Sequence, residues 1–191
     1  MNKNLSLLEK YNHPKNIRYN SFFKSLSIAD SRNLRIFVET GTSRGKTKFF
    51  FINKLNWKDG MSTLIFAEYT KYINGTLYTC DISPKNINNS MKFTEKFKDH
   101  IKYITSDSVQ FLKGFKTQID FLYLDSLDGH NSTEASLHQL KEIQSAMNKL
   151  HKNSLILLDD KLSKSNLSLN FMLKKNFKIL NETNEQVLLS L

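Results

Sequence analysis

Short apolar segments that alternate with helical segments constrain the fold of this chain most strongly. Five such segments are typical of buried strands: residues 34–41, 75–83, 101–107, 119–125 and 154–160. The stretches that separate most of them favour helices, at residues 62–73, 86–100, 108–115 and 132–153. Strands separated by helices predict a parallel sheet with helices on both faces.

The C-terminal part of the chain breaks this alternation. After a stretch at 166–176, two apolar segments at 177–182 and 186–191 are separated only by a polar turn around Thr183 and Asn184. Without a crossover helix, these two strands must pair antiparallel. The sequence therefore predicts an α/β three-layer sandwich whose seven-stranded sheet is mostly parallel and has an antiparallel C-terminal strand.

Length and composition fit one domain. The chain has 191 residues, and we expect residues 1–33 to form an N-terminal arm or lid helices on a main domain at 34–191. No apolar run reaches about 18 residues, and the N-terminus lacks the pattern of a secretory signal. The single cysteine, Cys80, has no partner for an internal disulfide. We therefore expect a cytoplasmic protein without a membrane segment.

The chain is basic, with a net charge of +10 and a pI of about 9.6. Such a charge is consistent with nucleic acid, an anionic cofactor or an acidic partner. The lysines are scattered along the sequence rather than gathered in one block. This pattern favours a solvated basic surface over a dedicated binding patch.

Local signals support individual helix boundaries. The segment 132–153 is amphipathic, and its apolar residues recur at steps of three and four: Leu137, Leu140, Ile143, Met147 and Leu150. Asn131 with Glu134 three residues later resembles a capping pair. Ser62 is expected to cap the helix that follows it.

Ligands of open α/β sheets bind at the carboxyl ends of the strands, and each of the five strand ends carries an acidic residue. The first ends in "VETGTSRG", a turn with two glycines that is neither a GxGxxG motif nor a P-loop. Asp81 ends the second strand, where a carboxylate can accept hydrogen bonds from both hydroxyls of a ribose, or cap a turn. The remaining candidates come after the third, fourth and fifth strands: Asp107, Ser108, Asp125, Asp128, His130, Asp159 and Asp160.

The motifs "FVETGTSRG", "LYTCDIS", "YITSDS", "FLYLDS" and "LILLDD" occur in an order that resembles the class I S-adenosylmethionine-dependent methyltransferases. The resemblance covers about residues 34–191 and is closest to the metal-dependent O-methyltransferases of the catechol and macrocin types. It implies a Rossmann-like sandwich and S-adenosylmethionine as cofactor. By the same match, the cofactor would be bound by the following residues: Glu39, Gly41, Thr42, Ser43, Gly45, Asp81, Asp107, Ser108 and Asp125. Asp81 would hold the ribose, and Asp107 with Ser108 would lie near the adenine.

The resemblance also implies a divalent cation, Mg²⁺ or Mn²⁺, held by Asp125, Asp159 and Asp160. Hard cations bind oxygen ligands, and neighbouring strand ends lie about 5 Å apart. Such an ion would offset the repulsion between the adjacent carboxylates of Asp159 and Asp160. The alternative is that these two residues only open a loop and cap the segment after it.

The catalytic base is less clearly matched. The catechol type carries a lysine three residues after its first metal ligand, and this chain has Asp128 there. Asp128 and His130 are therefore the candidate bases, whereas His138 is expected to be a surface or boundary residue of its helix. The long loop at 46–59, with some helical content, is a candidate substrate lid together with the N-terminal arm. Its aromatic residues would form an apolar wall of the lid or pack in the core: Phe49, Phe50, Phe51 and Trp57.

The leading hypothesis is methyl transfer to a hydroxyl of a small molecule or sugar, aided by a divalent cation. The alternatives are an RNA or DNA methyltransferase, a catalytically silent cofactor-binding protein of the same fold and, least favoured, an NAD-dependent Rossmann enzyme. A homo-oligomer is consistent with the sequence. The acceptor itself cannot be read from the sequence.

Overall fold

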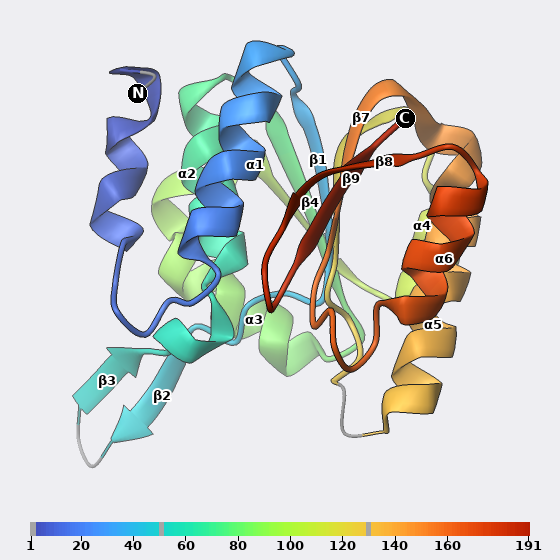
Figure 1. The fold of residues 1–191 in the computed structure, drawn as a ribbon. Coiled ribbons are helices and arrows are strands. Elements are labelled where there is room, and N and C mark those ends of the chain that lie inside the picture. The colour runs from blue at the N-terminus through green and yellow to red at the C-terminus, as the bar shows by residue number, and fades with distance from the viewer. Residues whose placement is uncertain (1–2, 50–51, 129–130) are drawn as a thin grey trace.

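A seven-stranded sheet forms the centre of the molecule (Figure 1). The computed structural model describes residues 3–49, 52–128 and 131–191. In chain order the strands of this sheet are β1 (Ile36–Thr40), β4 (Thr76–Asp81), β5 (Ile101–Thr105), β6 (Ile119–Leu124), β7 (Leu150–Leu158), β8 (Lys178–Glu182) and β9 (Val187–Ser190). Their spatial order is β5-β4-β1-β6-β7-β9-β8, and the first five are parallel. The predicted sheet is confirmed.

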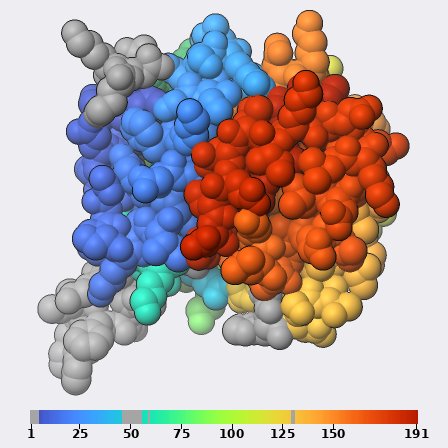
Figure 2. All heavy atoms as spheres, viewed as in Figure 1, coloured from blue at the N-terminus to red at the C-terminus, as the bar shows by residue number. Residues whose placement is uncertain are grey.

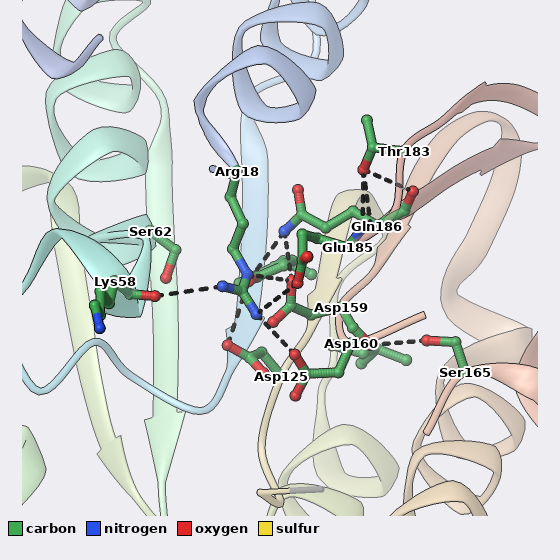
Figure 3. A network of polar contacts seen from close by, with 12 residues as sticks. Arg18, Lys58, Ser62, Asp125, Asp159, Asp160, Ser165, Thr183, Glu185 and Gln186 are labelled. Carbon is green, nitrogen blue, oxygen red and sulfur yellow. Dashed lines mark hydrogen bonds and ion pairs between the residues drawn. The ribbon is translucent and has the colours of Figure 1, made fainter. Parts of the chain in front are cut away.

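The antiparallel C-terminal hairpin is also confirmed. Strand β9 lies between β7 and β8 and runs antiparallel to both. The turn between β8 and β9 is closed by Thr183, whose hydroxyl oxygen accepts hydrogen bonds from the backbone N–H groups of Glu185 and Gln186. This turn directs residues 185–186 toward the end of β7 (Figure 3).

Helices cover both faces of the sheet (Figure 1). On one side lie α1 (Tyr19–Ser31), α2 (Ser62–Tyr72) and α3 (Pro84–Thr94), and on the other α4 (Ser108–Gly114), α5 (Ser132–Ala146) and α6 (Asn166–Lys174). Because side chains of a strand alternate between faces, neighbouring residues of one strand enter different cores. Phe121 of β6 packs in the core beneath α1 and α2, and Leu122 packs in the core beneath α5 and α6.

The N-terminal segment is helical and packs on the domain. A 3₁₀ helix, η1 (Lys3–Tyr11), is anchored to Glu68 of α2 by Lys10 and by the hydroxyl of Tyr11. Helix α1 packs against β7 and β8, so an N-terminal helix and a C-terminal strand lie side by side, as the adjoining blue and red regions of Figure 2 show.

Residues 46–59 depart from the expected loop with helical content. Strands β2 (Lys46–Phe49) and β3 (Ile52–Leu55) form an antiparallel hairpin that projects from the domain, followed by one 3₁₀ turn, η2 (Trp57–Asp59). The ring of Trp57 stacks on His13, with 5.0 Å between ring centroids. Trp57 therefore packs against the N-terminal segment. Phe50 and Phe51 lie outside the described residues.

Several helix boundaries also differ from those expected from sequence. Helix α5 ends at Ala146, and after the 3₁₀ turn η4 (Met147–Lys149) strand β7 begins at Leu150. Another 3₁₀ turn, η3 (Glu95–His100), ends the segment after α3. Leu137 of α5 is 45% exposed, because the apolar side of this helix faces the sheet through Ile143 instead.

The expected caps had different outcomes. The side chain of Asn131 accepts a hydrogen bond from the backbone N–H of Glu134 and caps α5, as predicted. Met61, not Ser62, occupies the N-cap position of α2. None of the helices in the described part of the chain is long and apolar enough to cross a membrane.

Candidate active site

The carboxyl ends of the parallel strands surround a cavity of about 420 Å³. The pairing of the sheet continues past these strand ends. The backbone N–H of Gly41 donates to the carbonyl oxygen of Cys80, and that of Asp125 donates to the carbonyl oxygen of Thr40. The cavity is lined by Gly41, Thr42, Ser43, Arg44, Ser62, Asp81, Ile82, Ser83, Asn86, Asp125, Ser126, Leu127 and Asp128. Five of the expected cofactor residues, including Asp81, therefore share one cavity.

The turn after β1 explains its glycine at position 41. Gly41 has a φ of +81°, and a Cβ atom placed there would lie 2.1 Å from the carbonyl oxygen of Asp125. Only glycine has neither the Cβ clash nor the strain of this left-handed conformation. This close approach brings the turn after β1 against the segment after β6. The turn and the segment each form one wall of the cavity.

Two expected cofactor residues, Glu39 and Gly45, line neither this cavity nor the smaller cavity that adjoins it. Glu39 is fully buried behind the turn, and its carboxylate accepts hydrogen bonds from the hydroxyls of Ser62, Thr63 and Thr79. The hydroxyl of Thr63 also accepts a hydrogen bond from the backbone N–H of Ser43. Glu39 thus supports the turn through intermediate hydroxyls.

Asp81 is held in place by its own helix-start segment. Its carboxylate accepts hydrogen bonds from the backbone N–H of Ser83, at 2.8 Å, and from the side-chain amide of Asn86. Since each carboxylate has about four acceptor positions, the group retains capacity for further donors from the cavity. Asp81 is therefore both a turn-forming residue and a candidate ribose ligand.

A smaller cavity of about 80 Å³ adjoins the first and shares Gly41 and Asp81 with it. Asp107 and Ser108 line this cavity, as does His138, whose Nε2 lies 2.9 Å from the Ser108 hydroxyl. Asp107 also caps α4 by accepting a hydrogen bond from the backbone N–H of Gln110. The two residues expected near the adenine therefore lie together, on the far side of Asp81 from the glycine turn.

The buried thiol of Cys80 also belongs to this smaller cavity. Burial, together with the nearby carboxylate of Asp81, raises the pKa of the Cys80 thiol to about 12. Its sulfur donates a weak hydrogen bond to the carbonyl oxygen of Ser106. Cys80 is thus a neutral apolar wall residue at physiological pH.

Asp125, Asp159 and Asp160 converge, as the resemblance implied. One carboxylate oxygen from each lies within 4.8 Å of the others. Figure 3 shows these three side chains together with Arg18, which reaches them from the start of α1. Arg18 donates from Nε to Asp159 and from Nη2 to Asp160, each at 2.7 Å. We call these three aspartates, with Arg18 and Lys164, the acidic cluster.

Lys164 is the second cation of the acidic cluster. Its Nζ lies 2.7 Å from Asp125, 3.3 Å from Asp160 and 3.2 Å from the carbonyl oxygen of Leu127. Only 2% of this lysine is exposed. Burial alone would lower the pKa of Lys164, but the three aspartates outweigh burial and raise it above its usual range.

The pKa values of two carboxyl groups of the cluster, Asp125 and Asp159, shift in opposite directions. Burial, with the charge of Asp159 beside it, raises the pKa of Asp125 well above its usual range. Burial would also raise the pKa of Asp159, but the charge and hydrogen bond of Arg18, with Lys164, lower it instead. Oδ2 of Asp159 has no hydrogen-bond partner among the described residues. A proton retained on the carboxyl group of Asp125 would donate a hydrogen bond to this oxygen.

In this arrangement the acidic cluster does not fit a divalent cation. Two cations already contact the three carboxylates, so Mg²⁺ or Mn²⁺ would have to displace Lys164 and Arg18 or accept their repulsion. The convergence of the aspartates is confirmed, while the metal itself stays a prediction.

Asp128, one candidate base, lies at the mouth of the larger cavity. Both of its carboxylate oxygens lie 2.6 Å from Nη2 of Arg44, and both side chains are more than half exposed. A base at this position would have to release Arg44. His130, the other candidate, lies outside the described residues.

Sequence reasoning missed the basic partners of the site. Lys164 lies four residues after Asp160, a spacing that could have suggested a local ion pair. No sequence signal connects Arg18 with Asp159, which is 141 residues away. The missed polar residues of the site are Arg18, Arg44, Asn86, Tyr123, Lys164 and Gln186.

Comparisons with known proteins agree with this fold. A family model described as a methyltransferase domain matches residues 38–161, roughly two thirds of the chain. A search of curated protein sequences found no match.

Solved structures show the same fold at low sequence identity. The methyltransferase PaMTH1 of Podospora anserina, solved with S-adenosylhomocysteine (SAH) bound, is 16% identical over 100% of this chain and 88% of its own, with a TM-score of 0.63. The O-methyltransferase NovP is 8% identical over 90% and 78%, with a TM-score of 0.62. The N-methyltransferase NodS of Bradyrhizobium japonicum WM9 is 11% identical over 93% and 96%, with a TM-score of 0.61.

Proposed function

The chain belongs to the methyltransferase domain family, and on that premise we propose that it methylates a hydroxyl oxygen of a small molecule or sugar. Methyl transfer from S-adenosylmethionine is the activity of the family and fold. The oxygen acceptor is our proposal. The observation that carries the assignment of a methyltransferase site is the cavity at the strand ends, where the turn at Gly41, the carboxylate of Asp81 and the segment 125–128 face one another.

The residues of the two cavities fit S-adenosylmethionine. When bound, this cofactor supplies an electrophilic methyl group on a positively charged sulfur. Asp81 would accept hydrogen bonds from the ribose hydroxyls, and Asp107 with Ser108 would border the adenine. The turn at 41–43 would enclose the methionine end and direct it toward Asp125 and Asp128.

The segment after β6 would bind the acceptor. As an oxygen–carbon bond forms, the acceptor hydroxyl must lose its proton, and Asp128 lies at the cavity mouth where it could take it. Arg44 would release the carboxylate of Asp128 before it accepts that proton. The O-methyltransferase NovP and the N-methyltransferase NodS share the fold, so the fold is compatible with an oxygen acceptor. Asp125, Asp159 and Asp160 receive no metal-binding role here, because Arg18 and Lys164 contact them.

Calorimetry with SAH tests the cofactor site. We expect binding by the wild-type chain and at least about tenfold weaker binding by Asp81→Ala, which corresponds to one lost charged hydrogen bond. Asp99→Ala, at an exposed aspartate of the same charge, is the matched control. Equal affinities of the Asp81 variant and wild type would remove Asp81 from the site.

The acceptor atom is tested separately. The enzyme is incubated with ¹³C-methyl S-adenosylmethionine and pools of hydroxylated small molecules, and the products are analysed by NMR. A methyl carbon bonded to oxygen supports the proposal, whereas methyl groups found only on nitrogen or carbon contradict it. SAH binding without any transfer would favour the catalytically silent alternative.

Methyl transfer to nucleic acid is a second candidate. Lys113, Lys141 and Lys149 line a groove of about 630 Å³ beside α4 and α5, on a chain of net charge +10. RNA binding that weakens steeply with added salt, and a smaller salt dependence in Lys141→Gln, would support it. Salt-independent or absent RNA binding would reject it.

A further inference from the structure

Arg18 connects the N-terminal segment to the acidic cluster at the end of β7. Its side chain is 12% exposed, and its guanidinium contacts both Asp159 and Asp160 (Figure 3). A third nitrogen, Nη1, donates to the carbonyl oxygen of Lys58 at 3.4 Å. The planar guanidinium therefore spans three segments: the start of α1, the end of β7 and the turn before α2. Such a fork is a rigid cationic ligand for carboxylates.

Lys164 connects the other side of the cluster. Its ammonium group has three hydrogen-bond donors, and three oxygens lie within reach: those of Asp125, Asp160 and the carbonyl of Leu127. Two of its donors make hydrogen bonds within the protein, to Asp125 and to Leu127, and its charge pairs with Asp160. It joins the turn after β7 to the segment after β6, whose residues Asp125 and Leu127 line the larger cavity.

The backbone conformation of Asp160 forms part of the turn that carries Lys164. Asp160 has a φ of +53°, a left-handed conformation that is uncommon for a residue other than glycine. The backbone N–H groups of Ser163 and Lys164 donate to its carbonyl oxygen and form the turn that brings the Lys164 side chain back over the cluster. The turn thus places the Lys164 ammonium group within 3.3 Å of both Asp125 and Asp160.

From these contacts we infer that Arg18 and Lys164 take the place of a divalent cation, so that the acidic cluster is a closed network of ion pairs and this methyltransferase acts without a metal. Lys164 positions Asp125 and the segment after it, which borders Gly41 and the larger cavity, and Arg18 holds Asp159 and Asp160 beside them. Lys164 acts through Asp125 rather than on the acceptor, because it is only 2% exposed and its ammonium group contacts oxygens of the protein. This inference concerns the cluster alone and does not depend on which acceptor is methylated.

Direct Mn²⁺ binding tests the inference without an activity assay. Electron paramagnetic resonance measures free and bound Mn²⁺ in the wild-type chain and in Lys164→Met, Lys164→Arg and Lys161→Met. Lys161 is the matched control, since it pairs with Glu182 outside the cluster. We expect no site in wild type, Lys164→Arg or Lys161→Met at millimolar Mn²⁺. Lys164→Met should gain a site at least about tenfold tighter, because removing one nearby positive charge favours a dication.

The location of the new site is checked by adding Asp159→Asn to Lys164→Met, which should abolish it. Tight Mn²⁺ binding by the wild type that Asp159→Asn removes would overturn the inference. If Lys164→Met does not fold, the wild-type chain alone decides. An unfolding temperature equal in EDTA and in Mn²⁺ supports the closed network, and a rise with Mn²⁺ contradicts it, since ligands of the native state stabilise it.

Discussion

Replacing Arg18 with methionine would leave the buried carboxylate of Asp159 without its main countercharge. Methionine keeps much of the apolar stem of arginine and removes the guanidinium. Asp159 is 1% exposed at its side chain, whereas the second partner, Asp160, is 27% exposed. Removing one partner of a buried ion pair costs about 3–5 kcal/mol, and the exposure of Asp160 favours the lower end, about 3 kcal/mol.

This cost is measurable by urea denaturation followed by circular dichroism. In a domain of this size, about 3 kcal/mol corresponds to a decrease of roughly 6–12 °C in the unfolding temperature. Arg32→Met is the matched control, because Arg32 lies just after the other end of the same helix and donates to neutral partners, the carbonyl oxygen of Asn153 and the hydroxyl of Ser190. Its loss should cost about 1 kcal/mol.

A double-mutant cycle attributes the cost to the ion pair itself. If Asp159→Asn is already present, Arg18→Met should cost about 2 kcal/mol less than in wild type, since no buried charge is stranded. Equal losses from Arg18→Met and Arg32→Met, or additive effects in the cycle, would refute the reasoning.

Three further predictions concern the walls of the cavities. Gly41→Ala should abolish SAH binding, measured by calorimetry, because its Cβ would collide with the backbone of Asp125 and its φ is positive; retained affinity would contradict the close approach. Glu39→Gln should weaken SAH binding by roughly tenfold, since a neutral amide cannot accept all three hydroxyl hydrogen bonds, and an unchanged affinity would show that the turn does not need this support. At pH 8, Cys80 should react with iodoacetamide roughly a thousandfold more slowly than free cysteine, because its raised pKa leaves little thiolate. The reaction rate should rise about tenfold per pH unit until about pH 12. A rate that levels off near pH 9 would refute the raised pKa.

Periodicity and strand-end chemistry predicted much of this structure. Five apolar strands separated by helices predict a parallel sheet whose carboxyl ends lie at one edge. Because an acidic residue follows each strand, the sequence alone places Asp81 and Asp125 at that edge. The antiparallel C-terminal pair followed from the missing helix between its strands. These features are local in sequence or follow from the geometry of a parallel sheet.

The parts that were not predicted depend on contacts between distant segments. A carboxylate at a strand end can face a cofactor, a cation or a basic side chain, and the sequence around Asp159 does not say which. Glu39 was expected in the cavity, yet its partners Ser62 and Thr79 come from separate elements and hold it behind the wall. The hairpin at 46–55 was missed because its two strands are only four residues each.

The most direct test of this account is a crystal structure of the chain grown with SAH. The account predicts the cofactor product in the joined cavities, with its ribose hydroxyls within hydrogen-bond distance of Asp81, its base beside Ser108 and its sulfur directed toward Asp128. A structure with the ligand bound elsewhere, or with the Asp81 carboxylate turned away from the ribose, would contradict it.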